Sequence, residues 1–231
     1  MPGPGAAPGA YDAVVFDLDG TLVDSATAMQ AIAAVFFREI GAEPLDLGET
    51  RRCIGWGVAA FLEKALAARG LSPDRRDFQR LLDRFSDLYG AAPGEANTPF
   101  PGVDAALGAL ARHAVPMAIC TNKPARPTAN LLRALGWQSH FRAVITGDSL
   151  EKRKPDPAPL RLAVEQLAAH SVPSRVLYVG DSEIDAAAVA AAGLPFALYL
   201  GGYHTAPVST LAPTHAFTDY AALVGLVTGG S

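Results

Sequence analysis

The sequence predicts an α/β fold, in which a parallel β-sheet core carries one large helical insertion. Short apolar runs bounded by turn residues alternate with helix-like segments along most of the chain, as in layered α/β proteins. The alternation is broken once, because 98 positions separate Asp17 from Val115. A strand–helix–strand crossover needs far fewer residues. Half of the 231 residues are hydrophobic and 18% are charged, so the chain has ample apolar surface for a core.

The expected strands are short and apolar, because both faces of a parallel sheet are covered by helices. They comprise residues 13–16, 117–120, 143–145, 176–179 and 196–200. Helices are expected between them at residues 103–113, 126–135, 159–169 and 183–192. The last of these helices ends before Gly193 and Pro195, which are typical of a helix C-terminus.

The long connection after the first strand contains helical patterns and no convincing strand. Helices are expected at residues 25–40, 58–69 and 75–89. We therefore expect residues 22–98 to form an α-helical cap domain, and residues 1–21 and 99–231 to form the core, with a hinge at residues 99–102. Ligands of open α/β sheets bind outside the carboxyl ends of the strands, so the insertion is placed to cover such a site.

Composition excludes several classes of partner. The 19 Lys and Arg residues against 23 Asp and Glu give a net charge of −4, so no nucleic-acid partner is expected. Cys53 and Cys120 show neither disulfide-framework nor zinc spacing, and the five histidines show no ligand spacing. The first ten residues, rich in Pro, Gly and Ala, are expected to form a flexible tail. The sequence shows no membrane span or targeting pattern, so a cytoplasmic location is expected. The protein is expected to be a monomer or a homodimer.

Polar residues follow the expected strands at the edge where a ligand should bind. Asp17 and Asp19 follow the first strand, and Asp181 follows the fourth, with Asp185 one helical turn later. Four carboxylates in one crevice repel one another strongly unless a cation is bound. Because all the ligands are oxygen atoms, the cation expected is Mg²⁺.

Other residues at this edge suit a phosphoryl group. Thr121, Asn122 and Lys154 supply hydrogen-bond donors and a positive charge for its oxygens. Asp17 is then the candidate nucleophile, which would form an aspartyl-phosphate. Asp19 is the candidate acid/base, protonating the leaving alkoxide and then taking a proton from water.

Four segments, taken in order, resemble the motifs of the haloacid dehalogenase-like hydrolase superfamily. They are Asp-Leu-Asp-Gly-Thr-Leu-Val-Asp-Ser at 17–25, Thr-Asn-Lys-Pro at 121–124, Lys-Pro-Asp-Pro at 154–157 and Gly-Asp-Ser-Glu-Ile-Asp at 180–185. The resemblance spans nearly the whole chain. It implies a Rossmann-like core with a mobile helical cap that closes over the site.

The resemblance also implies the role of each motif residue. Asp17 is the nucleophile, Asp19 the acid/base, and Thr121 and Lys154 are phosphate ligands. The implied magnesium ligands are Asp17, the main-chain carbonyl of Asp19, and Asp181, while Asp185 orients the water shell of the metal. Lys154 is preferred to Lys123 and Lys152 because Pro155 follows it, as in the family motif.

Several residues keep more than one interpretation. Asp148 either contacts the metal or caps a helix, and Lys123 lies either at the site entrance or on the surface. Arg51 and Arg52 either pair with a substrate carboxylate or are simply exposed. Residues 55–60 match a dinucleotide-binding pattern, but a charged segment rather than a strand precedes them. We expect a tight turn that opens a helix there.

The function expected is that of a Mg²⁺-dependent phosphomonoesterase acting on a small phosphorylated metabolite, and the resemblance implies 2-phosphoglycolate as the foremost substrate. Other substrates kept open are a sugar phosphate, a nucleotide or pyrophosphate. A phosphosugar mutase would pass the phosphoryl group to a second sugar rather than to water. A non-catalytic, metabolite-sensing regulator is the alternative from another class, and it has no use for an acid/base such as Asp19.

Overall fold

The computed structural model describes residues 11–168 and 175–230. The expected N-terminal tail at residues 1–10, the last residue of the helix expected at 159–169, and His170 lie outside these ranges. Among the described residues, no helix combines the length and the apolar character needed to cross a membrane.

The core is a six-stranded sheet in which every neighbouring pair of strands is parallel. Its strands are β1 (Ala13–Phe16), β4 (Met117–Cys120), β5 (Ala143–Ile145), β6 (Val176–Gly180), β7 (Phe196–Tyr199) and β8 (His215–Phe217). The order across the sheet is β5-β4-β1-β6-β7-β8. Renumbered by their place in the chain, these strands run 3-2-1-4-5-6, which is the order of the Rossmann-like doubly wound fold.

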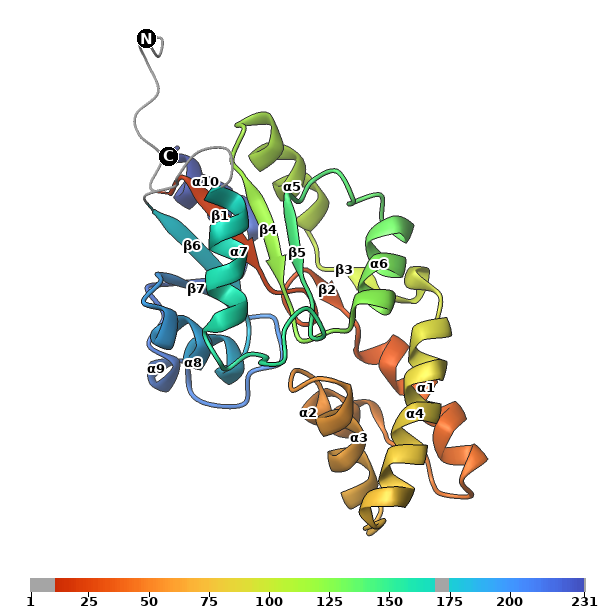
Figure 1. The fold of residues 1–231 in the computed structure, drawn as a ribbon. Helices are drawn as coiled ribbons and strands as arrows, with labels where there is room; N and C mark the ends of the chain where they lie inside the picture. Colours follow the sequence, from red (N-terminus) through yellow and green to blue (C-terminus); the bar gives the residue numbers. More distant parts are fainter. Residues whose placement is uncertain (1–10, 169–174, 231) are drawn as a thin grey trace.

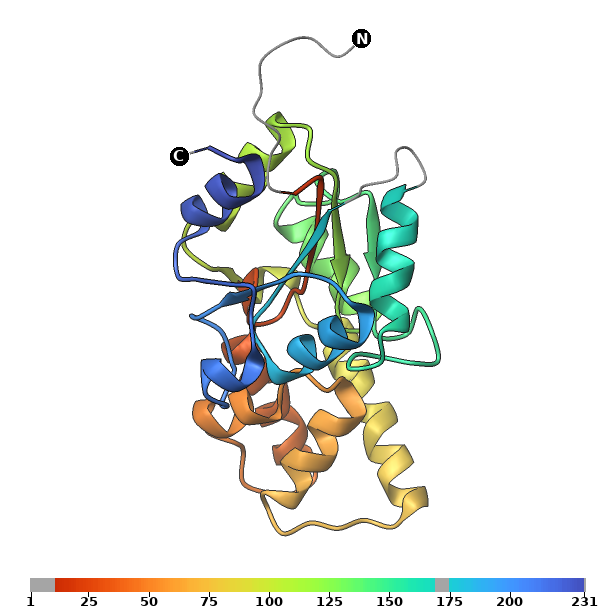
Figure 2. The ribbon, with the colours of Figure 1, turned by 90° about the vertical axis from the view of Figure 1, so that its left-hand side faces the viewer.

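Helices cover both faces of the sheet, because alternate residues of each strand point to opposite sides. Val14 and Phe16 of β1 belong to one hydrophobic cluster, and Ala13 and Val15 belong to another. The first face is covered by α5 (Val103–Arg112), α6 (Ala125–Ala134) and α10 (Tyr220–Thr228). The other is covered by α7 (Ala158–Ala168), α8 (Glu183–Ala192) and α9 (Val208–Leu211), so the sheet lies between two helical layers (Figure 2).

The connection between β1 and β4 is helical, as expected. It contains α1 (Ala26–Glu39), α2 (Leu47–Cys53), α3 (Val58–Ala67), α4 (Arg75–Ala91) and the short 3₁₀ helix η1 (Gly94–Ala96). The chain enters and leaves through two short antiparallel strands, β2 (Val23–Asp24) and β3 (Thr98–Pro99). Figure 1 shows the four α-helices beyond the end of the sheet towards which its strands run. We call α1–α4 the helical insertion.

The helical insertion has a hydrophobic cluster of its own. Phe85 of α4 stacks on Phe61 of α3, with ring centroids 5.4 Å apart, and meets Phe36 of α1 edge to face at 5.3 Å. All three side chains are buried. Aromatic pairs of this kind add to the stabilisation that burial alone supplies. The helices are therefore held to one another by aromatic packing.

The structure adds elements that the sequence patterns do not predict: β2, β3, β8, α2, α9 and α10. Helix α2 nevertheless carries a start signal, because Asp46 and Glu49 form a reciprocal capping box. The turn expected at residues 55–60 is confirmed. Gly55 and Gly57 have φ values of 107° and 88°, and Gly57 directly precedes α3.

Replacing Phe85 with alanine is expected to lower the free energy of unfolding by about 3–5 kcal/mol, because it leaves a cavity between Phe36 and Phe61. Val35→Ala is the control, since Val35 is 44% exposed on α1, and its effect is expected within about 0.5 kcal/mol. Urea titration followed by circular dichroism measures both. A loss below about 1 kcal/mol for Phe85→Ala would show that the aromatic cluster does not hold the helical insertion together.

Candidate active site

The candidate site lies at the carboxyl ends of the central strands. Asp17 directly follows β1, Thr121 follows β4 and Asp181 follows β6. Strands β1 and β6 are neighbours, and the strand order reverses between them. In doubly wound sheets this reversal opens a crevice in which ligands bind. Asp17 and Asp181 therefore stand on the two sides of that crevice.

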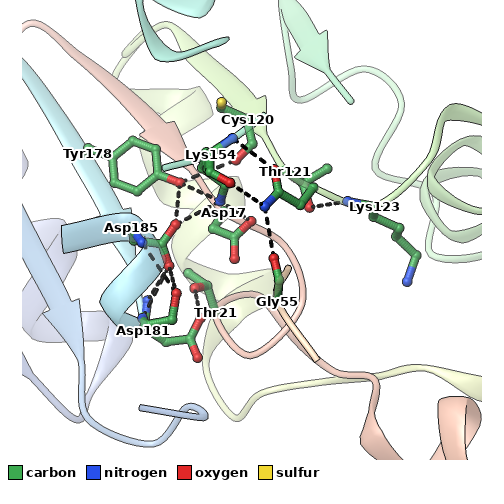
Figure 3. A network of polar contacts seen from close by, with 12 residues as sticks. Asp17, Thr21, Gly55, Cys120, Thr121, Lys123, Lys154, Tyr178, Asp181 and Asp185 are labelled. Atoms are coloured by element: carbon green, nitrogen blue, oxygen red, sulfur yellow. Dashed lines mark hydrogen bonds and ion pairs between the residues drawn. The ribbon is translucent and has the colours of Figure 1, made fainter. Parts of the chain in front are cut away.

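The ammonium group of Lys154 connects these strand ends (Figure 3). Lys154 lies in the loop between β5 and α7, and its Nζ donates to Asp17 Oδ1 at 2.7 Å, Asp185 Oδ1 at 2.7 Å and Tyr178 Oη at 2.9 Å. An ammonium group has three N–H donors, so these three partners use all of them. The side chain is 3% exposed, and this network compensates a charge that water does not reach.

Asp181 is fixed by partners from two other loops. Thr21 Oγ1 donates to its Oδ1 at 2.8 Å, and the main-chain N–H of Tyr203 donates to its Oδ2 at 2.6 Å. A Cβ atom on Gly20 or Gly202 would overlap the Asp181 side chain. Glycine at both positions allows the two loops to enclose this carboxylate.

Asp185, in the first turn of α8, has hydrogen bonds at both oxygens. Its Oδ1 accepts from Lys154 and from Tyr178 Oη at 2.8 Å. Its Oδ2 accepts from Ser182 Oγ at 2.7 Å and from the main-chain N–H groups of Asp181 and Ser182. Asp185 thereby holds the β6–α8 turn in place.

Burial and mutual repulsion separate the pKa values of the carboxyl groups. Burial raises the pKa of Asp17 to about 7, with the Lys154 charge opposing the shift and the Asp185 charge adding to it. Burial, together with the charges of Asp185 and Asp17, also raises the pKa of Asp181 well above its usual range. For Asp185, burial acts upward, but the charge and hydrogen bonds of Lys154, with those of Ser182 and Tyr178, lower the pKa.

Asp17, Asp181 and Asp185 present carboxylate oxygens that lie within 4.8 Å of one another. The ammonium group of Lys154 contacts two of these three acidic side chains, Asp17 and Asp185. Besides burial, repulsion between the carboxylates contributes to the raised pKa values of Asp17 and Asp181, and a further positive charge would relieve this repulsion. Because the available ligands are all oxygens, the donor set fits a hard divalent cation such as Mg²⁺.

Thr121 and Asn122, predicted to bind phosphate, lie beside this cluster. Thr121 is buried, and its Oγ1 accepts from the main-chain N–H of Lys123 at 3.2 Å. Asn122 Nδ2 donates to the carbonyls of Lys154 and Gly55, each at 2.9 Å, and Oδ1 accepts from the Lys154 N–H. Asn122 therefore ties the Lys154 loop to the helical insertion.

Asp19, the predicted acid/base, faces a second lysine. Its Oδ1 lies 2.8 Å from Lys123 Nζ, and the Lys123 side chain is only 3% exposed. The ammonium group also lies 5.2 Å from the ring centroid of Tyr89, on α4 of the helical insertion. Figure 3 shows Lys123 extending away from the cluster around Lys154. Lys123 is thus buried beside Asp19 in the cavity at the site, and the surface interpretation is wrong.

The structure also shows the location of the other residues that had more than one interpretation. Asp148 accepts from the Ala125 N–H at 2.9 Å and from Thr146 Oγ1, so it caps α6 and lies outside the carboxylate group that could hold a metal. Lys152 is an exposed partner of Asp156. Arg51, about half exposed, pairs with Asp24 at 3.1 Å. Cys53 and Cys120 are buried free thiols.

The sequence analysis did not predict two tyrosines of the site, Tyr178 and Tyr203. Tyr178 bonds Lys154 and Asp185, and its signal was a polar atom within the otherwise aliphatic strand β6. Tyr203 Oη donates to Asp24 Oδ1 at 2.6 Å and accepts from the N–H groups of Ser25 and Ala26, at the start of α1. Tyr203 joins the Asp181 loop to the helical insertion, a contact that no local pattern indicates.

This sheet, with its helical insertion and its acidic crevice at the carboxyl edge, defines the architecture of a known class of hydrolases. Residues 14–199 match the family model of the haloacid dehalogenase-like hydrolases, and the chain belongs to that family.

Two relatives that match most of the chain are both named phosphoglycolate phosphatase. A phosphoglycolate phosphatase of Cereibacter sphaeroides is 45% identical over 207 residues, covering 90% of this chain and 93% of that protein. Another, of Rhodobacter capsulatus, is 38% identical over 217 residues, covering 94% and 97%. A solved structure of a predicted phosphoglycolate phosphatase from Haemophilus somnus, 25% identical, superposes with a TM-score of 0.82 and covers 94% of this chain and 98% of that one.

Replacing Lys154 with methionine is expected to lower the free energy of unfolding at neutral pH by about 3–5 kcal/mol, because it leaves Asp17 and Asp185 buried without a counter-charge. The already raised pKa of Asp17 then rises further, and that of Asp185 rises above its unfolded value. The folded variant therefore binds more protons, relative to its unfolded chain, than wild type does, and it loses more stability as pH rises. The difference from wild type should therefore be larger at about pH 8 than at about pH 5.

Urea unfolding in EDTA at both pH values measures this difference. The control is Lys152→Met, whose effect is expected within about 0.5 kcal/mol because its ion pair is exposed. A Lys154→Met deficit that does not change with pH would contradict the electrostatic explanation.

Proposed function

We propose that the protein is a Mg²⁺-dependent phosphomonoesterase that hydrolyses 2-phosphoglycolate to glycolate and phosphate through an aspartyl-phosphate on Asp17. Family membership and the name shared by its relatives support the reaction class and the substrate. The observation that carries the proposal is the carboxylate cluster at β1 and β6, held by Lys154 and followed by Asp19 at the edge of the same crevice.

In the first step, a carboxylate oxygen of Asp17 attacks phosphorus and the bond from phosphorus to the ester oxygen breaks. Asp19 donates a proton to that oxygen, so glycolate leaves as the alcohol. Lys154 lies 2.7 Å from Asp17, so its positive charge would stabilise phosphoryl oxygens there, and the Thr121 hydroxyl would bind one of them. Asn122, predicted as a third phosphate ligand, acts in this proposal by holding the Lys154 backbone in place.

In the second step, Asp19 takes a proton from water as the water oxygen attacks phosphorus. The Asp17–phosphorus bond breaks, which releases phosphate and restores both aspartates. Asp17, Asp181 and the main-chain carbonyl of Asp19 would hold Mg²⁺, which would supply positive charge to neutralise carboxylate and phosphoryl oxygens. Asp185 contributes by orienting the metal site, because hydrogen bonds already engage both of its oxygens.

The proposal includes the division of the chain into a core (residues 1–21 and 99–231) and a cap (residues 22–98) that closes to exclude water. The separate hydrophobic cluster of the helical insertion supports it. The cytoplasmic location and the monomeric or homodimeric state stay predictions.

Asp17→Asn is expected to lower Mg²⁺-dependent phosphate release by about 10⁴-fold or more while the fold is retained, because the nucleophile is lost. Asp19→Asn is expected to be slow or to accumulate the aspartyl-phosphate. Phosphate assays with and without EDTA, and the mass of the acid-quenched protein, test both. Equal turnover by folded Asp17→Asn would refute the covalent mechanism, and normal turnover by Asp19→Asn would remove its acid/base role.

Among 2-phosphoglycolate, glucose 6-phosphate, β-glucose 1-phosphate, a nucleoside monophosphate and pyrophosphate, we expect kcat/KM to be highest for 2-phosphoglycolate. The margin should be at least about 100-fold, or about 3 kcal/mol of transition-state binding. Phosphate release from each compound with Mg²⁺ gives the comparison. A different preferred compound would keep the phosphatase chemistry and discard this substrate.

A further inference from the structure

Lys123 has no place in the steps described above, although it is one of two buried lysines at the site. Its ammonium group lies between Asp19, at 2.8 Å, and the ring of Tyr89 on α4. Keeping a lysine charge away from water is costly unless the charge is compensated. Asp19 compensates the charge of Lys123, and the pair places a cation directly beside the proposed acid/base.

The cavity around Lys123 is small and largely apolar. Its volume is about 30 Å³, room for a very few non-hydrogen atoms, between the Asp17–Asp19 loop and the helical insertion. The insertion contributes Met29 from α1, Phe61 from α3 and Tyr89 from α4, and the Tyr89 hydroxyl is a polar partner of Lys123. Among the described residues that line this cavity, Lys123 is the only cationic one.

The geometry of the reaction limits where a leaving-group carboxylate can lie. In 2-phosphoglycolate a single carbon separates the ester oxygen from the carboxylate. The acid/base must be within hydrogen-bond reach of that ester oxygen. Because Lys123 Nζ lies 2.8 Å from Asp19 Oδ1, its charge is next to the place that such a carboxylate must occupy.

We propose that Lys123 binds the carboxylate of the leaving group and thereby selects phosphate esters of short 2-hydroxy acids. The inference rests on the proposed function, in which Asp19 faces the leaving oxygen. An ammonium–carboxylate contact in this cavity adds a second charge partner for Lys123, whereas a neutral leaving group leaves Asp19 as its charge partner. The small volume of the cavity favours a short leaving group at this position.

The arginines of the helical insertion provide a rival assignment. Arg51 and Arg52, with Lys64, line a wider cleft of about 380 Å³ that adjoins the small cavity at Asp17 and Asp19. Arg51 is paired with Asp24 and about half exposed, so water screens its charge. Lys123 differs from these residues in being buried directly beside the acid/base.

The test compares two substrates that differ in the carboxylate: 2-phosphoglycolate and ethyl phosphate. The quantity measured is the ratio of their kcat/KM values, in wild type, Lys123→Met, Arg51→Met and the exposed-lysine control Lys152→Met. We expect the ratio to fall by about 100-fold in Lys123→Met and to stay at the wild-type value in the other two. The ratio cancels any effect on Asp19 that is common to both substrates.

Each other outcome overturns a distinct part of the argument. If Lys123→Met slows both substrates equally, Lys123 only positions Asp19 and the carboxylate site is refuted. If only Arg51→Met lowers the ratio, the carboxylate binds in the wider cleft. If wild type hydrolyses ethyl phosphate as well as 2-phosphoglycolate, the proposed substrate itself fails, together with the site that depends on it.

Circular dichroism and thermal melting check the folding of each variant. Should Lys123→Met not fold, Lys123→Gln replaces it, because glutamine keeps a hydrogen-bond donor towards Asp19 without the charge. Inhibition of the wild-type enzyme by glycolate and by its neutral analogue glycolamide gives a result that needs no variant. Stronger inhibition by glycolate supports the site, and equal inhibition overturns it.

Discussion

A buried ammonium group, that of Lys154, joins parts of the chain that are far apart in the sequence. Its three partners come from the end of β1, from within β6 and from the first turn of α8. The cost of removing these charges from water is compensated only while the partners remain together. The strand ends are thereby fixed before any ligand binds, which is the condition for electrostatic stabilisation of a transition state without reorganisation.

Two buried lysines divide the site into two environments. Lys154 belongs to the acidic side, where burial and repulsion raise the pKa values of Asp17 and Asp181 and favour a cation. Lys123 belongs to the side formed by the helical insertion, where its neighbours are Asp19 and mainly apolar side chains. In our proposals, chemistry common to phosphate esters occurs on the first side, and discrimination between leaving groups on the second.

The sequence predicted the fold and the site best where the signal lies within a short segment, as in an apolar strand or a motif that follows it. Strands β1, β4 and β5 begin and end as expected, and Asp17, Asp181 and Asp185 come together because parallel strands end at one edge. Strands β2 and β3 have two residues each, too few to show a periodicity. They form because the chain before the insertion pairs with the chain after it. The burial of Lys123 depends on Tyr89 and Asp19, and the role of Tyr203 depends on Asp24 and Asp181, contacts that arise only on folding.

The paired strands β2 and β3 bring the two ends of the helical insertion side by side. The insertion also buries its own aromatic cluster, separate from the two clusters that flank the sheet. A segment attached at adjacent points and packed around its own centre can change in length or sequence without altering the spacing of the strand ends. If the insertion meets the leaving group as we propose, its surface can be replaced while the residues at the strand ends are inherited intact, so that new substrates can arise on one chemistry.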